Sequence, residues 1–255
     1  MLIHLRLCRT VLIHCAAERR PDVAEADPDA AVRLNVAASR KLSELCAEHN
    51  VYMIYISTDY VFPGNAPADG YDVGAKVEPT NLYGQTKADG ERAVFEDGIG
   101  KTTVLRVPVL YGKAHENAES AVNILLDNIL MAPKDKKAKM DNWATRYPTN
   151  VEDVANVLVQ LADKAHARPM QTPPILHFSS QDKTWTKYLI AKFFCELVDK
   201  DSEMLEPVNV GPDVAKGETI RPRDCHLSNR AIEALGVDTK TVDFEEWWRA
   251  YYKKE

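Results

Sequence analysis

Glycine is scarce in this sequence, which has 11 glycines in 255 residues and none before Gly64. A glycine-rich turn after the first strand is what brings the backbone of a dinucleotide-binding fold close to a pyrophosphate group. The absence of glycine ahead of Gly64 therefore excludes that motif from the first part of this chain.

Long apolar runs and a positive net charge are also missing. No segment approaches the ~18 uninterrupted apolar residues of a membrane-spanning helix, and the mean hydropathy is −0.33. The formal net charge of −6 repels a phosphate backbone on average. We therefore expect a protein whose partners are neither membranes nor nucleic acids.

The cysteines and histidines lack the spacing of metal sites. No Cys-x-x-Cys pair occurs, and the seven histidines never fall at metal-ligand intervals. An odd number of widely spaced cysteines is typical of a reducing compartment, so we expect a cytoplasmic protein without a bound metal. The five cysteines are Cys8, Cys15, Cys46, Cys195 and Cys225.

The first half of the chain alternates apolar runs with helical periodicity. Residues 11–15, 51–57 and 102–107 form short apolar runs, as in strands covered on both faces of a parallel sheet. Residues 29–49 and 82–96 place apolar side chains at helical intervals. This alternation predicts an α/β fold with a Rossmann-like, doubly wound parallel sheet.

The pattern loosens after Gly112 and predicts a smaller C-terminal α/β lobe. We divide the chain into a partial dinucleotide-binding domain at 1–115 and a lobe at 116–255 that is mixed into the first domain. The elements expected in the lobe are a basic loop at 134–139, a strand at 175–178 and helices at 120–130, 151–164, 184–198, 229–235 and 244–253.

Three side chains are candidates for chemistry. Tyr83 and Lys87 lie four residues apart in a predicted helix, and therefore on one face of it. Thr58, with the adjacent Ser57 as the alternative, ends a predicted strand, at the sheet edge where parallel α/β folds bind ligands. A cation beside Tyr83 favours its phenolate form, so the three groups suit proton transfer to a carbonyl during hydride transfer. On spacing alone, a packed tyrosine with a solvated lysine is the more common explanation of such a pair.

Four segments occur in an order that matches a known superfamily. They are His-Cys-Ala-Ala at 14–17, Ser-Thr-Asp-Tyr-Val-Phe at 57–62, Tyr-Gly-Gln-Thr-Lys at 83–87 and Leu-Arg-Val-Pro-Val-Leu-Tyr-Gly at 105–112. Together they resemble the extended short-chain dehydrogenases/reductases, and in particular the dTDP-4-dehydrorhamnose reductase-like (RmlD-like) proteins. The resemblance covers nearly the whole chain.

Two branches of that group remain open. The reductases carry Asp-Gln-x-Gly-x-Pro-Thr where this chain has residues 140–149, and the Gln and Gly are missing here. That segment and residues 14–23 resemble the regulatory β subunits of methionine adenosyltransferase. This resemblance implies an NADP-binding regulator that associates with the catalytic subunit and modulates S-adenosylmethionine biosynthesis. The alternative is an NADPH-dependent sugar-nucleotide reductase that uses Thr58, Tyr83 and Lys87 as catalytic residues.

The resemblance also assigns cofactor contacts. It implies that NADP touches Cys15 and Arg19 after the first strand, Tyr83 and Lys87 on the helix, and Leu110 after the third strand. Three of these residues also suit a purely structural role: Cys15 and Leu110 fit a core, and Arg19 fits a solvated surface.

Relative to the superfamily, the glycine-rich βα units that normally precede residue 11 are not in this sequence. We therefore expect weak or no NADP binding by the chain as written. We also expect a free strand edge and an uncovered apolar surface, which favour pairing with a partner.

The C-terminal segment 244–253 is rich in aromatic residues. Its four aromatics in six positions cannot share one helix face, and aromatic side chains dominate interface hot spots. The segment is therefore either a docking element for the catalytic subunit or an ordinary core helix. The four residues are Trp247, Trp248, Tyr251 and Tyr252.

Overall fold

The computed structural model describes residues 11–97, 101–133, 137–167, 171–213 and 218–253. The strands are β1 (Val11–His14), β2 (Tyr52–Thr58), β3 (Thr102–Val107), β4 (Leu110–Tyr111), β5 (Ala138–Asp141), β6 (Thr149–Asn150), β7 (Ile175–His177) and β8 (Leu205–Val208). The α-helices are α1 (Pro21–Ala26), α2 (Pro28–Val32), α3 (Ala38–Glu48), α4 (Leu82–Asp97), α5 (Ile124–Leu130), α6 (Val151–Ala167), α7 (Lys187–Leu197), α8 (Arg230–Ala234) and α9 (Phe244–Tyr252). Shorter helical segments are η1 (Arg33–Ala37, a π-helix), η2 (Asp59–Val61), η3 (Asn117–Glu119) and η5 (Ser202–Met204).

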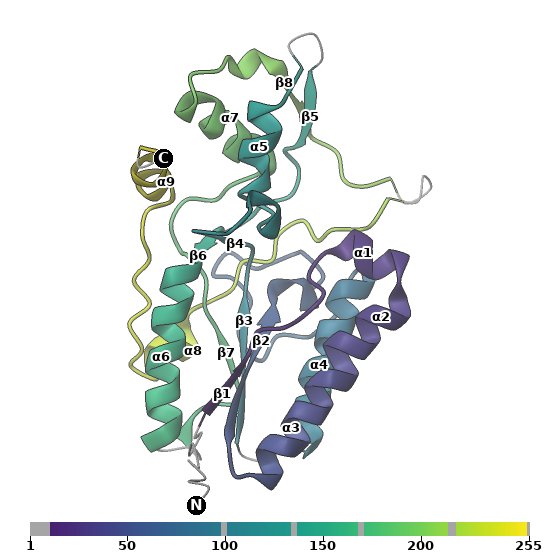
Figure 1. Cartoon of the computed structure of the whole chain (residues 1–255), viewed down its shortest axis with the longest axis vertical. Helices are drawn as coiled ribbons and strands as arrows, with labels where there is room; N and C mark the ends of the chain where they lie inside the picture. The colour runs from purple at the N-terminus through teal and green to yellow at the C-terminus, as the bar shows by residue number, and fades with distance from the viewer. Residues whose placement is uncertain (1–10, 98–100, 134–136, 168–170, 214–217, 254–255) are drawn as a thin grey trace, which may run out of the picture.

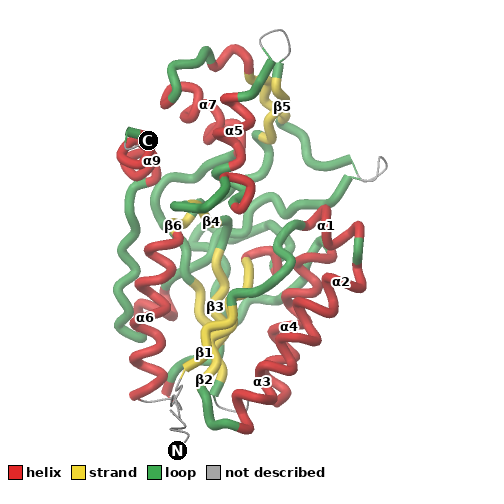
Figure 2. Tube along the Cα trace, in the orientation of Figure 1, coloured by secondary structure: helices red, strands yellow, loops and turns green. Residues whose placement is uncertain are grey.

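A parallel sheet in the order β1-β2-β3-β7 organises the fold. Alternate side chains of its strands face opposite layers, as the pleat requires. Ile54 and Leu105 pack in the cluster that includes α6, whereas Met53 and Val104 pack toward α3 and α4. Figures 1 and 2 show α6 on one side of the sheet and α3 and α4 on the other. The predicted doubly wound α/β fold is confirmed.

β1 is an edge strand. Within the described residues it pairs only with β2, so one of its edges is free, as expected. The expectation that both faces of 11–15 are covered is wrong, because the side chain of Ile13 is 40% exposed and Val11 and Leu12 are half-buried. An apolar run alone does not distinguish an edge strand from a central one.

The predicted helix at 29–49 forms as α2, η1 and α3 without a break. Its buried face, however, mixes small apolar residues such as Ala31 and Cys46 with polar ones. Asn35 and Ser39 are fully buried, whereas Leu34 and Leu45 are exposed. The close approach of α4 explains this inversion: a Cβ atom on Gly90 would lie only 2.6 Å from the Asn35 carbonyl oxygen. Small and polar side chains fit so narrow a gap, and leucines do not.

The lobe packs around an aromatic cluster. It contains the parallel pair β5-β8 and the helices α5, α7 and α9, and the parallel pair β4-β6 joins it to the residues before 116 (Figure 1). The Thr186 hydroxyl accepts a hydrogen bond from Leu189 N at 3.1 Å and so starts α7. The buried aromatic residues of this cluster are Tyr111, Trp185, Phe193, Phe194, Phe244 and Trp248.

Two expectations for the lobe need correction. The helix expected at 120–130 begins at Ile124, because residues 117–119 form the separate turn η3. The basic loop expected at 134–139 is a strand from Ala138 onward, and its residues 134–136 lie outside the described chain. The remaining predicted helices and strands lie within a few residues of those observed.

α9 is a core helix on one face. Phe244 and Trp248 are buried in the aromatic cluster, and Trp247 stacks on Tyr251 with ring centroids 4.8 Å apart. Glu246 and Arg249 on the same helix are exposed. The core-helix alternative is therefore confirmed for the buried face, while a docking role of the exposed face stays a prediction.

Residues from both halves of the chain build the sheet. β7 pairs with β3, and α6 packs against β1 and β2, although both elements follow residue 116. The division at residue 115 stays a prediction. In the described chain, no helix has the length and apolarity needed to cross a membrane, and no three His, Cys, Asp or Glu side chains gather as a metal site.

Candidate functional site

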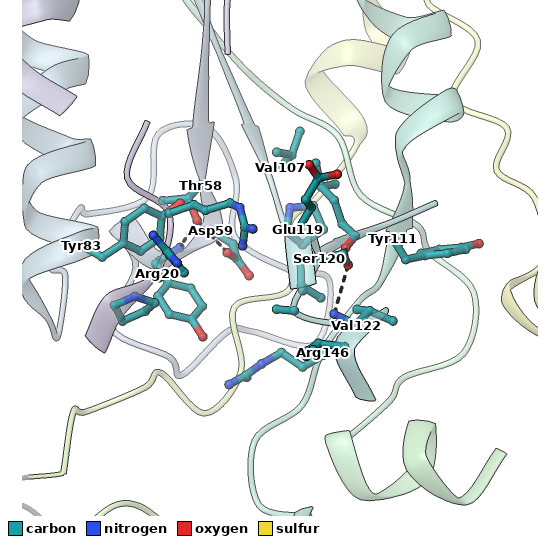
Figure 3. Close-up of a pocket in the computed structure, with 18 of the residues that line it drawn as sticks. Arg20, Thr58, Asp59, Tyr83, Val107, Tyr111, Glu119, Ser120, Val122 and Arg146 are labelled. Atoms are coloured by element: carbon teal, nitrogen blue, oxygen red, sulfur yellow. Dashed lines mark hydrogen bonds between the residues drawn. The ribbon is translucent and has the colours of Figure 1, made fainter. Parts of the chain in front are cut away.

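A cavity of about 690 Å³ opens where the carboxyl ends of β1, β2 and β3 face the lobe. Strand ends supply one part of its lining, and η3, α5 and the start of α7 supply the other. Figure 3 shows part of this lining, with Tyr83 and Thr58 on one side. All the residues predicted from the sequence line this one cavity: Cys15, Arg19, Thr58, Tyr83, Lys87 and Leu110.

Tyr83 and Thr58 meet at the junction of α4 and β2. The Thr58 hydroxyl donates a hydrogen bond to the Asp59 carboxylate at 3.0 Å and also hydrogen-bonds to the Tyr83 phenol. The Tyr60 ring contacts Tyr83 edge to face, with centroids 5.8 Å apart. Burial raises the pKa of the Tyr83 phenol, and the hydrogen bond between this phenol and Thr58 lowers it less. The phenol is therefore protonated at neutral pH, and the effect of Lys87 on its pKa stays a prediction.

Lys87 is held beneath this edge of the sheet. Its ammonium donates a hydrogen bond to the Ile56 carbonyl oxygen at 2.7 Å and lies 3.9 Å from the centroid of the Tyr55 ring. Burial lowers the pKa of Lys87 to about 7, although the nearby Glu91 carboxylate raises it. Because an ammonium has three donors, Lys87 keeps the capacity to bind a ligand hydroxyl at the cavity wall.

A buried ion pair between Arg106 and Glu91 lies close to Lys87. Arg106 on β3 donates two hydrogen bonds to Glu91 on α4, at 2.9 and 2.7 Å, and is only 2% exposed. Ser57 donates to the same carboxylate at 2.5 Å. His177 contacts Arg106 at 3.2 Å, and its pKa is lowered to about 3 by burial and by that cation. Arg106 lies in a strand predicted to be buried, and a buried arginine requires a partner, so this pair was detectable in principle.

The loop after β1 is tied to α4 through Asn35. The amide of Asn35 accepts a hydrogen bond from Glu18 N at 2.8 Å and donates to the Glu18 carbonyl and to the Thr86 hydroxyl, both at 3.0 Å. This loop carries Cys15, whose thiol pKa is raised by burial even though its side chain reaches solvent. No sequence signal marks the role of Asn35, because the residue lies inside a helical pattern.

The two arginines of this loop have separate partners. Arg20 pairs with Glu18, with a nitrogen-oxygen distance of 3.1 Å, and Arg19 donates to the Ala118 carbonyl at 3.4 Å. Arg19 thus reaches from the loop after β1 to η3 on the opposite wall of the cavity. Both arginines stay charged, but Arg20 is occupied by Glu18, whereas Arg19 has no ion pair with a described residue and is the better placed of the two to meet a ligand.

The opposite side of the cavity carries cations that sequence reasoning missed. Arg146, Lys187 and Arg221 come from three separate segments, and all three line the cavity. Near them, burial raises the pKa of the Asp59 carboxyl to about 7, while Arg146 lowers it less. Figure 3 shows Arg146 away from Tyr83 and Thr58. The cavity therefore has a phenol and ammonium wall and a separate cationic wall.

A family model described as the RmlD substrate binding domain matches residues 4–254. The chain belongs to the RmlD substrate binding domain family. The expected resemblance to RmlD-like reductases is thereby confirmed.

Relatives of this RmlD-family chain fall into the two branches expected from its motifs. It is 42% identical over 232 residues to methionine adenosyltransferase 2 subunit beta from Rattus norvegicus, which covers 91% of the chain and 66% of that protein. It is 28% identical to a dTDP-4-keto-6-deoxy-D-glucose reductase from Streptomyces niveus, over 89% of the chain and 74% of that protein. The chain thus spans slightly less than two thirds of the rat beta subunit.

Solved structures share the fold of this RmlD-family chain. A dTDP-4-dehydrorhamnose reductase from Bacillus anthracis, crystallised in complex with NADP, superposes with a TM-score of 0.77. The alignment covers 96% of this chain and 79% of that one at 23% identity. At that identity the similarity concerns the fold.

Proposed function

We propose that this chain is a regulatory subunit of methionine adenosyltransferase, which binds the catalytic subunit and modulates S-adenosylmethionine biosynthesis. One observation carries the proposal: identity to the rat beta subunit is 42%, against 28% to the Streptomyces reductase over a similar share of the chain.

The cavity supports the same choice. The reductase segment Asp-Gln-x-Gly-x-Pro-Thr has glycine two residues before its proline, and this chain has Arg146 two residues before Pro148. Arg146 is a cavity-lining residue, so a long cationic side chain takes the place of a residue with no side chain. A substrate that sits against the glycine of a reductase meets a different surface here.

We extend the proposal to NADP. The phenol and ammonium wall fits a nicotinamide ribose, because Tyr83 and Lys87 bring a hydroxyl donor and an ammonium donor to one part of the cavity. The loop after β1 fits a pyrophosphate less well, since residues 15–20 contain no glycine. We therefore expect binding through the ribose contacts with weak overall affinity. Calorimetry with NADP tests this, and a submicromolar dissociation constant would contradict it.

Co-purification with a methionine adenosyltransferase catalytic subunit tests the main proposal. We expect a stable complex and a changed rate of S-adenosylmethionine formation when the two chains are mixed. The absence of both a complex and a rate change would reject a regulatory role. We also propose a cytoplasmic location and a functional division near residue 115, with the lobe carrying the partner-binding role.

A test of docking through α9 requires substitutions on the surface of the helix rather than a truncation. Deleting residues 247–255 removes Trp248 from the core and destabilises the lobe whatever α9 binds. The double variant Glu246→Ala/Arg249→Ala changes exposed residues of α9, of which Arg249 also pairs with Glu245 and lies 5.1 Å from the centroid of the Phe193 ring. We expect it to weaken the complex, whereas Lys41→Ala/Glu44→Ala, an exposed pair on α3, leaves the complex intact.

Equal binding by both double variants would exclude docking through the exposed face of α9. Circular dichroism and melting curves of the two variants should match the wild type. The comparison then reports on binding alone.

A second candidate function, NADPH-dependent reduction of a 4-keto-6-deoxy sugar nucleotide, is favoured by the contact between Thr58 and Tyr83 beside Lys87. When bound, the cofactor supplies a hydride. Tyr83 is then the proton donor, a role that its raised pKa suits because the phenol is protonated at neutral pH. NADPH oxidation that is lost in Tyr83→Phe would establish this activity.

A further inference from the structure

Glu91 lies on the same face of α4 as Tyr83 and Lys87. The three residues follow one another at intervals of four along the helix, so their side chains form one stripe. Tyr83 and Lys87 line the cavity, whereas Glu91 is only 5% exposed and is not among the lining residues. A carboxylate is seldom buried without partners, so the contacts of Glu91 indicate what it does.

Glu91 faces a row of side chains that crosses three strands. Ser57 on β2 and Arg106 on β3 are partners in the strand register, and so are Arg106 and His177 on β7. Arg106 donates to the Glu91 carboxylate at 2.9 and 2.7 Å, and Ser57 donates to it at 2.5 Å. His177 contacts Arg106 at 3.2 Å. One carboxylate on α4 therefore holds two neighbouring strands through three hydrogen bonds, two of them from a cation.

These hydrogen bonds are made at the end of β2 that carries ligand-binding groups. Ser57 directly precedes Thr58, the last residue of the strand. The carbonyl oxygen of Ile56 accepts a hydrogen bond from the Lys87 ammonium at 2.7 Å. Groups that bind a ligand work well only when their supports hold them within ~0.5 Å of the required position. Glu91 provides such a support, because the residue that it binds lies between Ile56 and Thr58.

Four titratable groups near Lys87 are uncharged at neutral pH. The Tyr55 ring centroid lies 3.9 Å from the Lys87 ammonium, and burial raises the pKa of the Tyr55 phenol. Burial also raises the pKa of the Tyr83 phenol and of the Cys15 thiol. The pKa of His14 on β1 is lowered by burial and by the charge of Lys87. These four side chains therefore do not balance the charge of the ammonium.

Glu91 supplies a negative charge next to Lys87. Burial lowers the pKa of Lys87 to about 7, and the Glu91 carboxylate raises it. The carboxylate thus serves two cations, Arg106 through hydrogen bonds and Lys87 through its electrostatic field. Charges interact more strongly in a buried environment than in water. Without Glu91, the buried Lys87 side chain would be mainly a neutral amine at neutral pH.

We propose that Glu91 is the positioning residue of the phenol and ammonium wall: it fixes the end of β2 that carries Thr58 and supplies the negative charge that Lys87 faces. Glu91 acts through Ser57 and Lys87 and does not itself reach the cavity. The inference rests on the proposed binding of NADP through Tyr83 and Lys87. It deepens that proposal by naming the residue on which those contacts depend.

NMR of the full chain, labelled with carbon-13 at the lysine ε carbons, measures the charge of Lys87. The Lys87 signal is the one that is missing from Lys87→Arg. We expect a titration midpoint of about 7 in the wild type, and a lower midpoint in Glu91→Gln because the carboxylate charge is gone. Glu96→Gln is the matched control on the same helix. Glu96 is exposed and pairs with Arg40, so its variant should leave the midpoint unchanged.

Two further variants keep the test decisive if Glu91→Gln does not fold. Glu91→Gln/Arg106→Gln removes both charges of the ion pair, leaves neither ion buried without its partner, and should also lower the Lys87 midpoint. Ser57→Ala removes one hydrogen bond to Glu91 and leaves the ion pair intact. In this variant the amides of residues 56–58 should exchange faster with solvent, while the Lys87 midpoint stays at its wild-type value.

Calorimetry with NADP at pH 7 connects these changes to binding. We expect a loss of affinity of at least about tenfold in Glu91→Gln, a smaller loss in Ser57→Ala and none in Glu96→Gln. An unmoved Lys87 midpoint in both Glu91 variants would overturn the inference, and so would an equal shift in Glu96→Gln. Unchanged amide exchange in Ser57→Ala would refute the role of Glu91 in holding Thr58.

Failure of the wild type to bind NADP would reject the proposed ribose contacts instead. The Lys87 titration and the amide exchange need no ligand, so they would still decide the role of Glu91. The two failures are therefore distinguishable.

Discussion

The sheet region and the lobe are each stabilised by a different kind of interaction. Behind the sheet, the buried pair of Arg106 and Glu91 fixes the geometry through directional hydrogen bonds. In the lobe, Phe194, Phe244 and Trp248 pack as rings, with few polar atoms among them. The cavity lies between the two regions. Directional hydrogen bonds in the sheet region fix the positions of side chains, so the loss of one partner leaves a buried charge unpaired. The lobe is stabilised instead by the burial of large apolar rings.

Replacing Trp248 by alanine should have the largest effect. Trp248 is fully buried, and removing such a side chain leaves a cavity and costs about 4 kcal/mol of unfolding free energy. Urea denaturation measures the loss. Hydrogen exchange should show the lobe opening while β2 and β3 stay protected, and uniform loss of protection would contradict the separation of the two regions.

Arg106→Met should destabilise the sheet by about 3 kcal/mol, because it leaves the Glu91 carboxylate buried without its partner. The matched control is Arg92→Met, which removes an exposed arginine from an ion pair on α4 and should change the free energy by less than about 0.5 kcal/mol. Chemical denaturation of both variants measures the difference. Equal losses would mean that the buried pair does not organise the sheet.

Asp59→Asn tests the junction between the two regions. Because the folded-state pKa of Asp59 is raised to about 7 from 3.8, the folded protein binds an extra proton between those values. Its contribution to stability is therefore greatest at low pH and falls as pH rises toward 7. The variant should remove that fall, on the order of 3 kcal/mol between pH 4.5 and 7.5. An unchanged pH profile of the unfolding free energy would show that Asp59 does not titrate there.

The smallest expected effect is that of Thr186→Ala, which removes the cap of α7. The hydroxyl that accepts from Leu189 N is lost, at a cost of about 1 kcal/mol. Thermal melting detects this loss, and Thr186→Ser should restore most of it. Failure of serine to restore stability would assign the effect to the side-chain contact of Thr186 with Asn142 or to its packing.

The sheet and one wall of the cavity could be predicted from the sequence because they depend on the local geometry of strands and helices. Strands β2 and β3 are buried on both faces, so their apolar runs are unambiguous. Thr58, Tyr83 and Lys87 follow from a strand end and a helix face, both of which have fixed geometry. Their grouping around one cavity agrees with that prediction, and their catalytic role stays a prediction.

Long-range pairings were not predictable from periodicity. Asn35 bonds to Glu18 and Thr86, 17 and 51 residues away, and nothing local marks it as buried. Arg146 belongs to a loop whose carbonyl partner, Pro222, is 76 residues away. The exposure of Leu34 likewise depends on how closely α4 approaches, which no single helix can show.

The π-helical turn η1 has a consequence for mutation by deletion. An α-helix advances about 100° per residue, so the extra residue in this wider turn resets which side of α3 faces α4. Removing one residue from Arg33–Ala37 would let this turn close as an ordinary α-helical turn and keep Ser39, Ser43 and Cys46 on their buried side. Removing one residue from within α3 would instead rotate the positions that follow it by about 100°, so the helical layer tolerates a one-residue deletion in the wide turn and not beyond it.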